Sequence, residues 1–209
     1  MGSAGSPVSP STADFKLGTP PTYYDITTTA AFSGTATMCS NYAGASYPNE
    51  RKLRLLHNAN GTWIDITTSL DVVTKTICGT TSSFSPFIVA QSIYPWRGFL
   101  APVDNGAVYN KMKAGAAVPV KFSLGGDQGL AIFLAGYPQS QVVSCANGVP
   151  VDVVEETVNA GGSTLTYDAV SQTYVYVWKT DKGWANTCRK FTLGLNDGSV
   201  QTALFQFTK

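Results

Sequence analysis

Four cysteines are the residues whose type and spacing point most directly to chemistry. They are Cys39, Cys78, Cys145 and Cys188, and none of them belongs to a Cys-x-x-Cys pair. Two fall in each half of the chain, which predicts one disulfide per half, Cys39–Cys78 and Cys145–Cys188. Closing loops of this length stabilises a fold by roughly 4 kcal/mol each in the chain-entropy model. Disulfides indicate an oxidising compartment; the alternative is four free, buried thiols in a cytosolic protein.

Metal chemistry has weak support in the sequence. A structural zinc site takes four Cys or His ligands, usually in closely spaced pairs, and the only histidine is His57. Turn carboxylates at Asp104, Asp127 and Asp181 could bind calcium with carbonyl oxygens, but no Asp-x-Asp-x-Asp spacing supports such a site. We therefore expect no cofactor, with calcium at these turns as the alternative.

Catalytic constellations are equally weak, and we expect the chain not to be an enzyme. A Ser-His-Asp system would have to use His57, which we expect to be a solvated residue at a turn. Glu155 and Glu156 are adjacent, so in a strand they point to opposite faces and do not converge. The segment GGDQG at 125–129 lacks the lysine of a phosphate loop and the dinucleotide fingerprint.

Tryptophans are the candidate ligand-binding residues. Trp63, Trp96 and Trp184 could stack on a sugar ring, and Trp184 lies with Trp178 around a WKTDKGW segment. The alternative for each is packing in a core. We favour the core for Trp178, because it ends the alternating run YVYVW, and for Trp63, in the core of a hairpin.

Composition excludes several classes of protein. Charged residues make up 13% of the chain, hydrophobic residues 44% and aromatic residues 11%, so the chain can bury a core and favours strands over helices. A net charge of +1, with no basic cluster longer than the four residues 51–54, argues against nucleic acid as a partner. No apolar run approaches the 18 or more residues of a membrane span, so we expect no membrane insertion.

Short strand patterns with turns between them recur from Tyr23 onward. In the first half we expect strands over 23–29, 35–41, 52–57, 62–67, 71–78 and 86–90. Asn58–Gly61 predicts a tight hairpin, with one face of KLRLLH buried. Residues 1–22 are rich in Ser, Pro, Gly and Thr, which predicts a flexible or extended lead-in whose first residues resemble an artificial leader. Gln91–Arg97 should be a stiff connector with packing between domains by Tyr94 or Trp96.

The second half repeats this pattern. AVPVKFSL alternates Val118, Val120, Phe122 and Leu124 with polar residues, and QTYVYVWK and VQTALFQF continue the alternation. A turn at 196–199 separates the last two strands. We therefore predict an all-β chain of two tandem Ig-like β-sandwich domains, at 23–91 and 92–209, each with one internal disulfide, which either bridges the sheets or ties a loop to one.

Residues 94–209 resemble a known family. The segments GFLAPVDN, KAGAAVPVKFSLGGDQGL, IFLAGYPQSQ, YVWKTDKGWANTCRKF and LFQFTK closely resemble the bacterial PxKF domain, with Pro119–Phe122 as the residues of its name. The first half is similar to the β-rich module that often precedes this domain near the C-termini of large secreted bacterial proteins. The resemblance implies an extracellular module and no catalytic residues.

Three functions follow as hypotheses. The first is a structural or adhesive module, secreted or on the cell surface, whose partner is the rest of its parent polypeptide. The second is a carbohydrate-binding accessory module, with a glycan or surface protein as its partner. The third is self-assembly through sheet edges, because threonine-rich, charge-poor strands in the first half leave their edges weakly protected.

Overall fold

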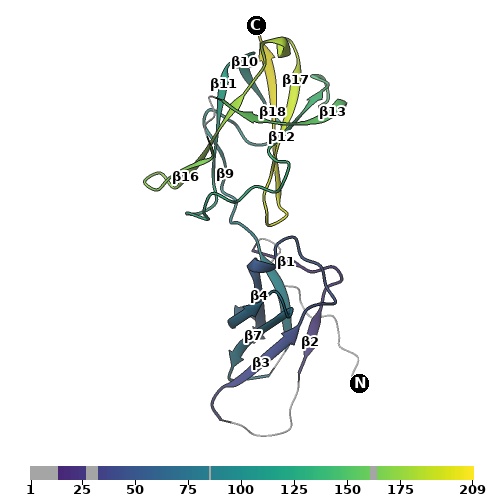
Figure 1. Ribbon diagram of the computed structural model, residues 1–209, viewed down its shortest axis with the longest axis vertical. Helices are drawn as coiled ribbons and strands as arrows, with labels where there is room; N and C mark the ends of the chain where they lie inside the picture. The colour runs from purple at the N-terminus through teal and green to yellow at the C-terminus, as the bar shows by residue number, and fades with distance from the viewer. Residues whose placement is uncertain (1–13, 27–32, 85, 161–163) are drawn as a thin grey trace. The chain divides into compact units, whose positions relative to one another are not determined.

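A computed structural model describes residues 14–26, 33–84, 86–160 and 164–209 (Figure 1). Its regular structure is β-strand, with short 3-10 helices η1 (Glu50–Lys52) and η3 (Lys182–Trp184). The chain divides into two compact units, the first ending at Ile93 and the second beginning at Tyr94. Each unit contains one disulfide. The predicted all-β architecture of two disulfide-containing sandwiches is confirmed.

The first unit is built from two antiparallel sheets. Its strands are β1 (Phe15–Leu17), β2 (Tyr23–Asp25), β3 (Ala36–Asn41), β4 (Leu53–Ala59), β5 (Thr62–Asp65), β6 (Thr67–Asp71), β7 (Thr76–Thr81) and β8 (Pro86–Ser92). One sheet has the order β1-β8-β4-β5, with β2 also paired to β8, and the other has the order β3-β7-β6. Because β1 pairs with β8, the sandwich begins before the predicted start at residue 23. Residues 1–13 of the predicted lead-in lie outside the described residues.

The β4–β5 hairpin forms as predicted, through Asn60 and Gly61 with φ values of 52° and 87°. Both positive φ angles suit an Asn-Gly turn of two residues. The prediction that β4 buries only one face is wrong. Leu55 packs into the core between the sheets, and Leu56 is also fully buried, in a small cluster with Ile88 on the other face.

His57 is buried, which corrects the expectation of a solvated turn residue. It is only 4% exposed, and its ring stacks on Phe87 with centroids 4.7 Å apart. Because the turn takes only two residues, β4 continues to Ala59 and carries His57 inside the sheet. Desolvation of the charged form lowers the pKa of His57 below its ordinary value.

The Cys39–Cys78 disulfide joins the edge strand β3 to the central strand β7 of the smaller sheet. These cysteines are register partners in adjacent antiparallel strands, and their Cα atoms are 4.1 Å apart. Met38 and Ile77, beside them in sequence, belong to the core that this sheet forms with β4 and β8. The bond therefore fixes the sheet that covers the core of the first unit.

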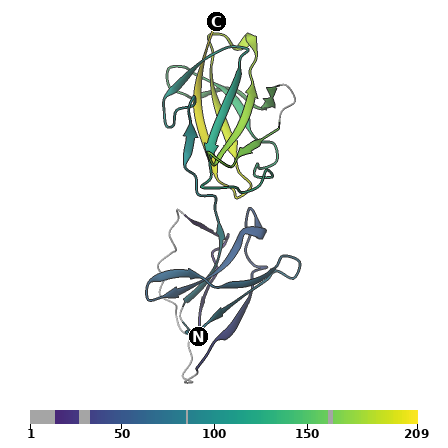
Figure 2. The same ribbon diagram turned by 90° about the vertical axis from the view of Figure 1, so that its left-hand side faces the viewer.

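The second unit is a sandwich of two sheets (Figure 2). Its strands are β9 (Gly98–Leu100), β10 (Tyr109–Lys113), β11 (Ala117–Ser123), β12 (Gln139–Val143), β13 (Pro150–Glu156), β14 (Val158–Asn159), β15 (Thr166–Asp168), β16 (Thr173–Lys179), β17 (Cys188–Gly194) and β18 (Val200–Thr208). One sheet has the order β10-β18-β17-β12-β13; the other has the order β14-β16-β11-β9, with β15 also paired to β16. The β10–β18 pair is parallel and the other pairs are antiparallel.

Trp178 lies at the centre of an aromatic core between these sheets. It is 0% exposed, and the ring centroids of Phe191, Phe205 and Phe207 lie 5.1, 5.3 and 5.8 Å from its own. The alternation of β11 supplies Val118, Val120 and Phe122 to the same cluster. The core position predicted for Trp178 is confirmed.

The predicted connector at 91–97 is divided between the two units. Gln91 and Ser92 end strand β8 of the first unit. Tyr94 is buried in the core of the second unit, and Trp96 packs against that core. Asp197, in the β17–β18 turn, accepts a hydrogen bond from the backbone N–H of Tyr94 (2.5 Å) and thereby fixes the start of this unit.

The Cys145–Cys188 disulfide ties a loop to one sheet and does not bridge the two sheets. Cys145 follows β12 and Cys188 begins β17, which is the neighbour of β12 in the same sheet. The two Cα atoms are 5.2 Å apart. The bond therefore anchors the loop between β12 and β13 at the start of β17.

Candidate functional site

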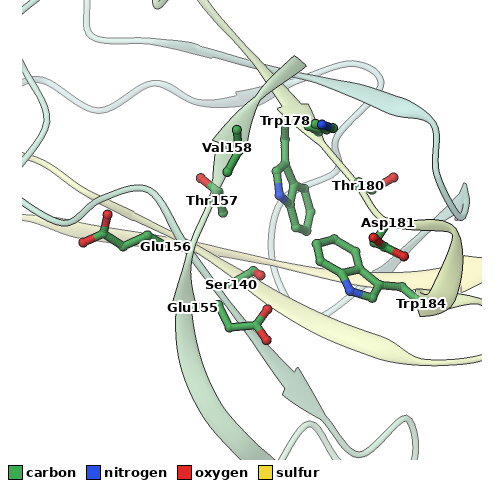
Figure 3. Close-up of a pocket in the computed structure, with 10 residues that line it drawn as sticks. Ser140, Glu155, Glu156, Thr157, Val158, Trp178, Thr180, Asp181 and Trp184 are labelled. Atoms are coloured by element: carbon green, nitrogen blue, oxygen red, sulfur yellow. The ribbon is translucent and has the colours of Figure 1, made fainter. Parts of the chain in front are cut away.

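A pocket in the second unit contains one of the predicted stacking residues, Trp184 (Figure 3). Its volume is about 210 Å³, and residues of both sheets and of the loop after β16 line it. The lining residues are Ser140, Glu155, Glu156, Thr157, Val158, Trp178, Lys179, Thr180, Asp181 and Trp184. The pocket thus combines indole rings with hydroxyl and carboxylate groups.

The backbone of the loop after β16 fixes the position of Trp184. Asp181 caps η3 by accepting a hydrogen bond from the Gly183 N–H at Oδ1 (2.6 Å). Thr187 donates its hydroxyl to the Trp184 carbonyl (2.7 Å). The indole of Trp184 packs on Trp178, with centroids 5.6 Å apart and planes at 46°. Trp184 is therefore part of a rigid wall.

The buried side chain of Arg189 contacts three of the residues that line the pocket. Its guanidinium lies 3.7 Å from the centroid of the Trp184 ring, and it donates to Ser140 Oγ (3.1 Å) and to the Glu155 carboxylate (2.7 Å). The Arg189 side chain is 5% exposed, whereas that of Glu155 is 46% exposed. Charge-assisted and cation–π contacts are strengthened when they are shielded from water, so this group orders both Trp184 and Glu155.

Arg189 was not among the predicted site residues, although the sequence contains a signal for it. In β17 the buried phase of the alternation includes Phe191 and Leu193, and Arg189 lies in the same phase. A charged residue in the apolar phase of a strand needs a partner. Its contacts with Ser140 and Glu155 depend on the pairing of β17 with β12 and of β12 with β13.

The polar groups of the pocket suit a ligand with several hydroxyls. A hydroxyl both donates and accepts, so it can donate to the carboxylates of Glu155 or Asp181 and accept from Ser140, whereas the hydroxyl of Thr180 already donates to the Ala116 carbonyl. The indole of Trp184 offers an apolar surface for C–H groups. Glu155 and Glu156 point to opposite sides of their strand (Figure 3), as the sequence predicted.

The other candidate tryptophans lie elsewhere. Trp63 packs against the small cluster of Leu56 and Ile88 in the first unit. Trp96 stacks on Phe122 with centroids 5.8 Å apart. Both are partly buried. Within the second unit, the tryptophan ring that packs on Trp184 is that of Trp178.

Two of the three candidate calcium-binding carboxylates, those of Asp127 and Asp181, accept hydrogen bonds within their own turns. Asp127 accepts from the Gly129 N–H (2.8 Å), Asp181 caps η3, and the backbone N–H of Asp104 donates to Asn110 (2.7 Å). Within the described residues, no group of three or more His, Cys, Asp or Glu side chains is placed to hold a metal ion.

No family model matches the chain, and no curated protein matches it. The resemblance of residues 94–209 to the PxKF domain therefore stays a prediction. In the part of the chain that the structure describes, none of the helices has the length and apolar character needed to cross a membrane.

Proposed function

We propose that this chain is a non-catalytic structural module of a larger secreted or cell-surface bacterial protein. The observation that carries the proposal is that each unit has its own core and its own disulfide. Units of about 100 residues bury modest cores, so a covalent closure contributes a large part of their stability. Such a bond persists outside the cell and not in a reducing cytosol.

The test of the structural role is thermal unfolding with and without a reductant. A module that depends on covalent closure should lose much of its stability when its disulfides are reduced. Unchanged unfolding temperatures in both units would contradict the proposal.

A second candidate function, carbohydrate binding, is favoured by the pocket around Trp184. The indole there is held in place by Arg189 and Trp178, and carboxylates and hydroxyls surround it. A sugar ring presents C–H groups on one face and hydroxyls at its edge, which matches these two kinds of wall. Glu155 and Asp181 would accept from the sugar hydroxyls.

We expect Trp184→Ala to weaken glycan binding at least tenfold, which corresponds to about 1.4 kcal/mol. The measurement is a glycan array followed by calorimetric titration of the best ligand. Trp184→Phe, which retains an aromatic ring, should lose less affinity, and Trp63→Ala in the first unit should have none of this effect. Absence of binding to any glycan, or equal binding by Trp184→Ala, would contradict a sugar site here.

A further inference from the structure

Strand β13 is an unusually exposed sheet edge. It is the last strand of its sheet, and all seven of its residues are exposed. Val151, Val153 and Val154 are 63%, 71% and 51% exposed. An edge strand with exposed apolar side chains and unpaired backbone groups is a template for another strand.

Strand β10 forms the opposite edge of the same sheet. Lys111 and Lys113 are exposed. Asn110, which precedes Lys111, is buried, and Met112, which lies between the two lysines, packs against the core. The two lysines therefore project from the outer face of the sheet. Strand β10 pairs with β18 on one side, and no other strand among the described residues pairs with its second edge.

The two edges carry opposite charge. Strand β13 contains Asp152, Glu155 and Glu156 and no basic residue, whereas β10 contains two lysines and no acidic residue. Glu155 contacts Arg189 on the inner side of the sheet, so by alternation Glu156 projects from the outer face. Glu156 of β13 and the two lysines of β10 thus lie on the same face of the sheet.

The strand directions also match. Strand β10 is parallel to β18, and each further neighbour in the order β18-β17-β12-β13 is antiparallel. Strand β13 therefore runs opposite to β10. When a second copy is placed beside β13 in the same orientation, its β10 lies antiparallel to β13, which is the stronger of the two pairings.

We propose that copies of this chain associate head to tail, with β13 of one copy paired to β10 of the next. The sheet then continues from copy to copy, with Lys111 or Lys113 opposite Glu156 on the outer face and the other lysine two residues along the same strand. A heterologous contact of this kind leaves a free edge at each end and produces an open chain of copies. Pairing of β13 with itself would bring carboxylates together, and pairing of β10 with itself would bring lysines together.

Hydrogen bonds within the chain limit where the new strand pairs. Gln141 donates its side-chain amide to the Asp152 carbonyl (2.7 Å), and the Val153 N–H donates to the Asp152 carboxylate (2.7 Å). A register shift lies opposite, between Gln141 and Val143. The contact is therefore centred on the C-terminal half of β13, where Glu156 lies.

Sedimentation velocity of the full chain, over a range of concentrations at low and high salt, tests this proposal. We expect a mean mass that rises with concentration without reaching a dimer plateau, and association that weakens with salt because it depends on charge. Lys111→Glu with Lys113→Glu should raise the apparent dissociation constant at least tenfold. Asp152→Lys with Glu156→Lys should do the same.

A mixture of the two double variants provides the decisive control. One variant has two acidic edges and the other has two basic edges, so an equimolar mixture should recover the assembly that each lacks alone. Lys190→Glu, in the inner strand β17, should leave assembly unchanged. The proposal is overturned if the unaltered chain stays monomeric at low salt, if the variants assemble as it does, or if the mixture does not recover assembly. Unfolding temperatures of the charge-reversed variants with and without reductant report the structural role separately, because assembly does not then add to the stability.

Discussion

Replacing Cys145 and Cys188 together by serine should lower the free energy of unfolding of the second unit by about 4 kcal/mol. For a domain of this size that corresponds to a fall in unfolding temperature of roughly 15–30 °C. The bond joins a loop to the start of β17, and without it the unfolded chain gains the freedom of the opened loop. Scanning calorimetry of the full chain measures the effect, because two compact units should give separate transitions.

The matched control is the pair Cys39→Ser and Cys78→Ser in the first unit. This change should lower the transition of the first unit and leave that of the second in place, because each disulfide lies within one unit. Equal shifts of both transitions after either change would show that the units are not closed separately. No shift after either change would show that the bonds do not stabilise the fold.

The second large effect is expected for Trp178→Ala, which should destabilise the second unit by about 3–5 kcal/mol. Trp178 is fully buried and contacts aromatic rings from β17, β18 and η3. Truncation leaves a cavity that these rings cannot fill without moving, because interiors are close-packed. Denaturant unfolding monitored by far-UV circular dichroism measures the loss.

Two variants separate the loss of volume from a general effect of mutation. Trp178→Phe should cost less than Trp178→Ala, because much of the ring remains. Val170→Ala should have little effect, because Val170 is 97% exposed in a turn. A loss below about 1 kcal/mol for Trp178→Ala would contradict its position at the centre of the core.

The sheet architecture could be predicted because its signals are local. Alternation with a period of two in the segment at 117–124 identifies its inward residues without knowledge of the partner strands. Asn60-Gly61 likewise specifies the hairpin. His57 was placed wrongly because the turn was taken to start at Asn58, whereas a two-residue turn extends β4 to Ala59. Strand β1 was missed because a three-residue strand shows no period.

The candidate site was only partly predictable. Trp184 could be chosen from its type and its loop, but its neighbours Ser140 and Glu155 come from β12 and β13, much earlier in the sequence, and meet Arg189 only through the pairing of β12 with β17 and β13. Their meeting depends on strand register, which a single sequence does not contain. The exposed edge formed by β13 could not be predicted either. A strand is an edge strand because no other strand pairs with one of its sides, and its own sequence does not show this.

Disulfide mapping of the oxidised chain tests most directly whether each unit is closed by its own bond. Tryptic peptides separated without reductant and identified by mass spectrometry should include one linked pair containing Cys39 and Cys78 and one containing Cys145 and Cys188. A bond between cysteines of different units, or four free thiols in the chain isolated without reductant, would contradict the account.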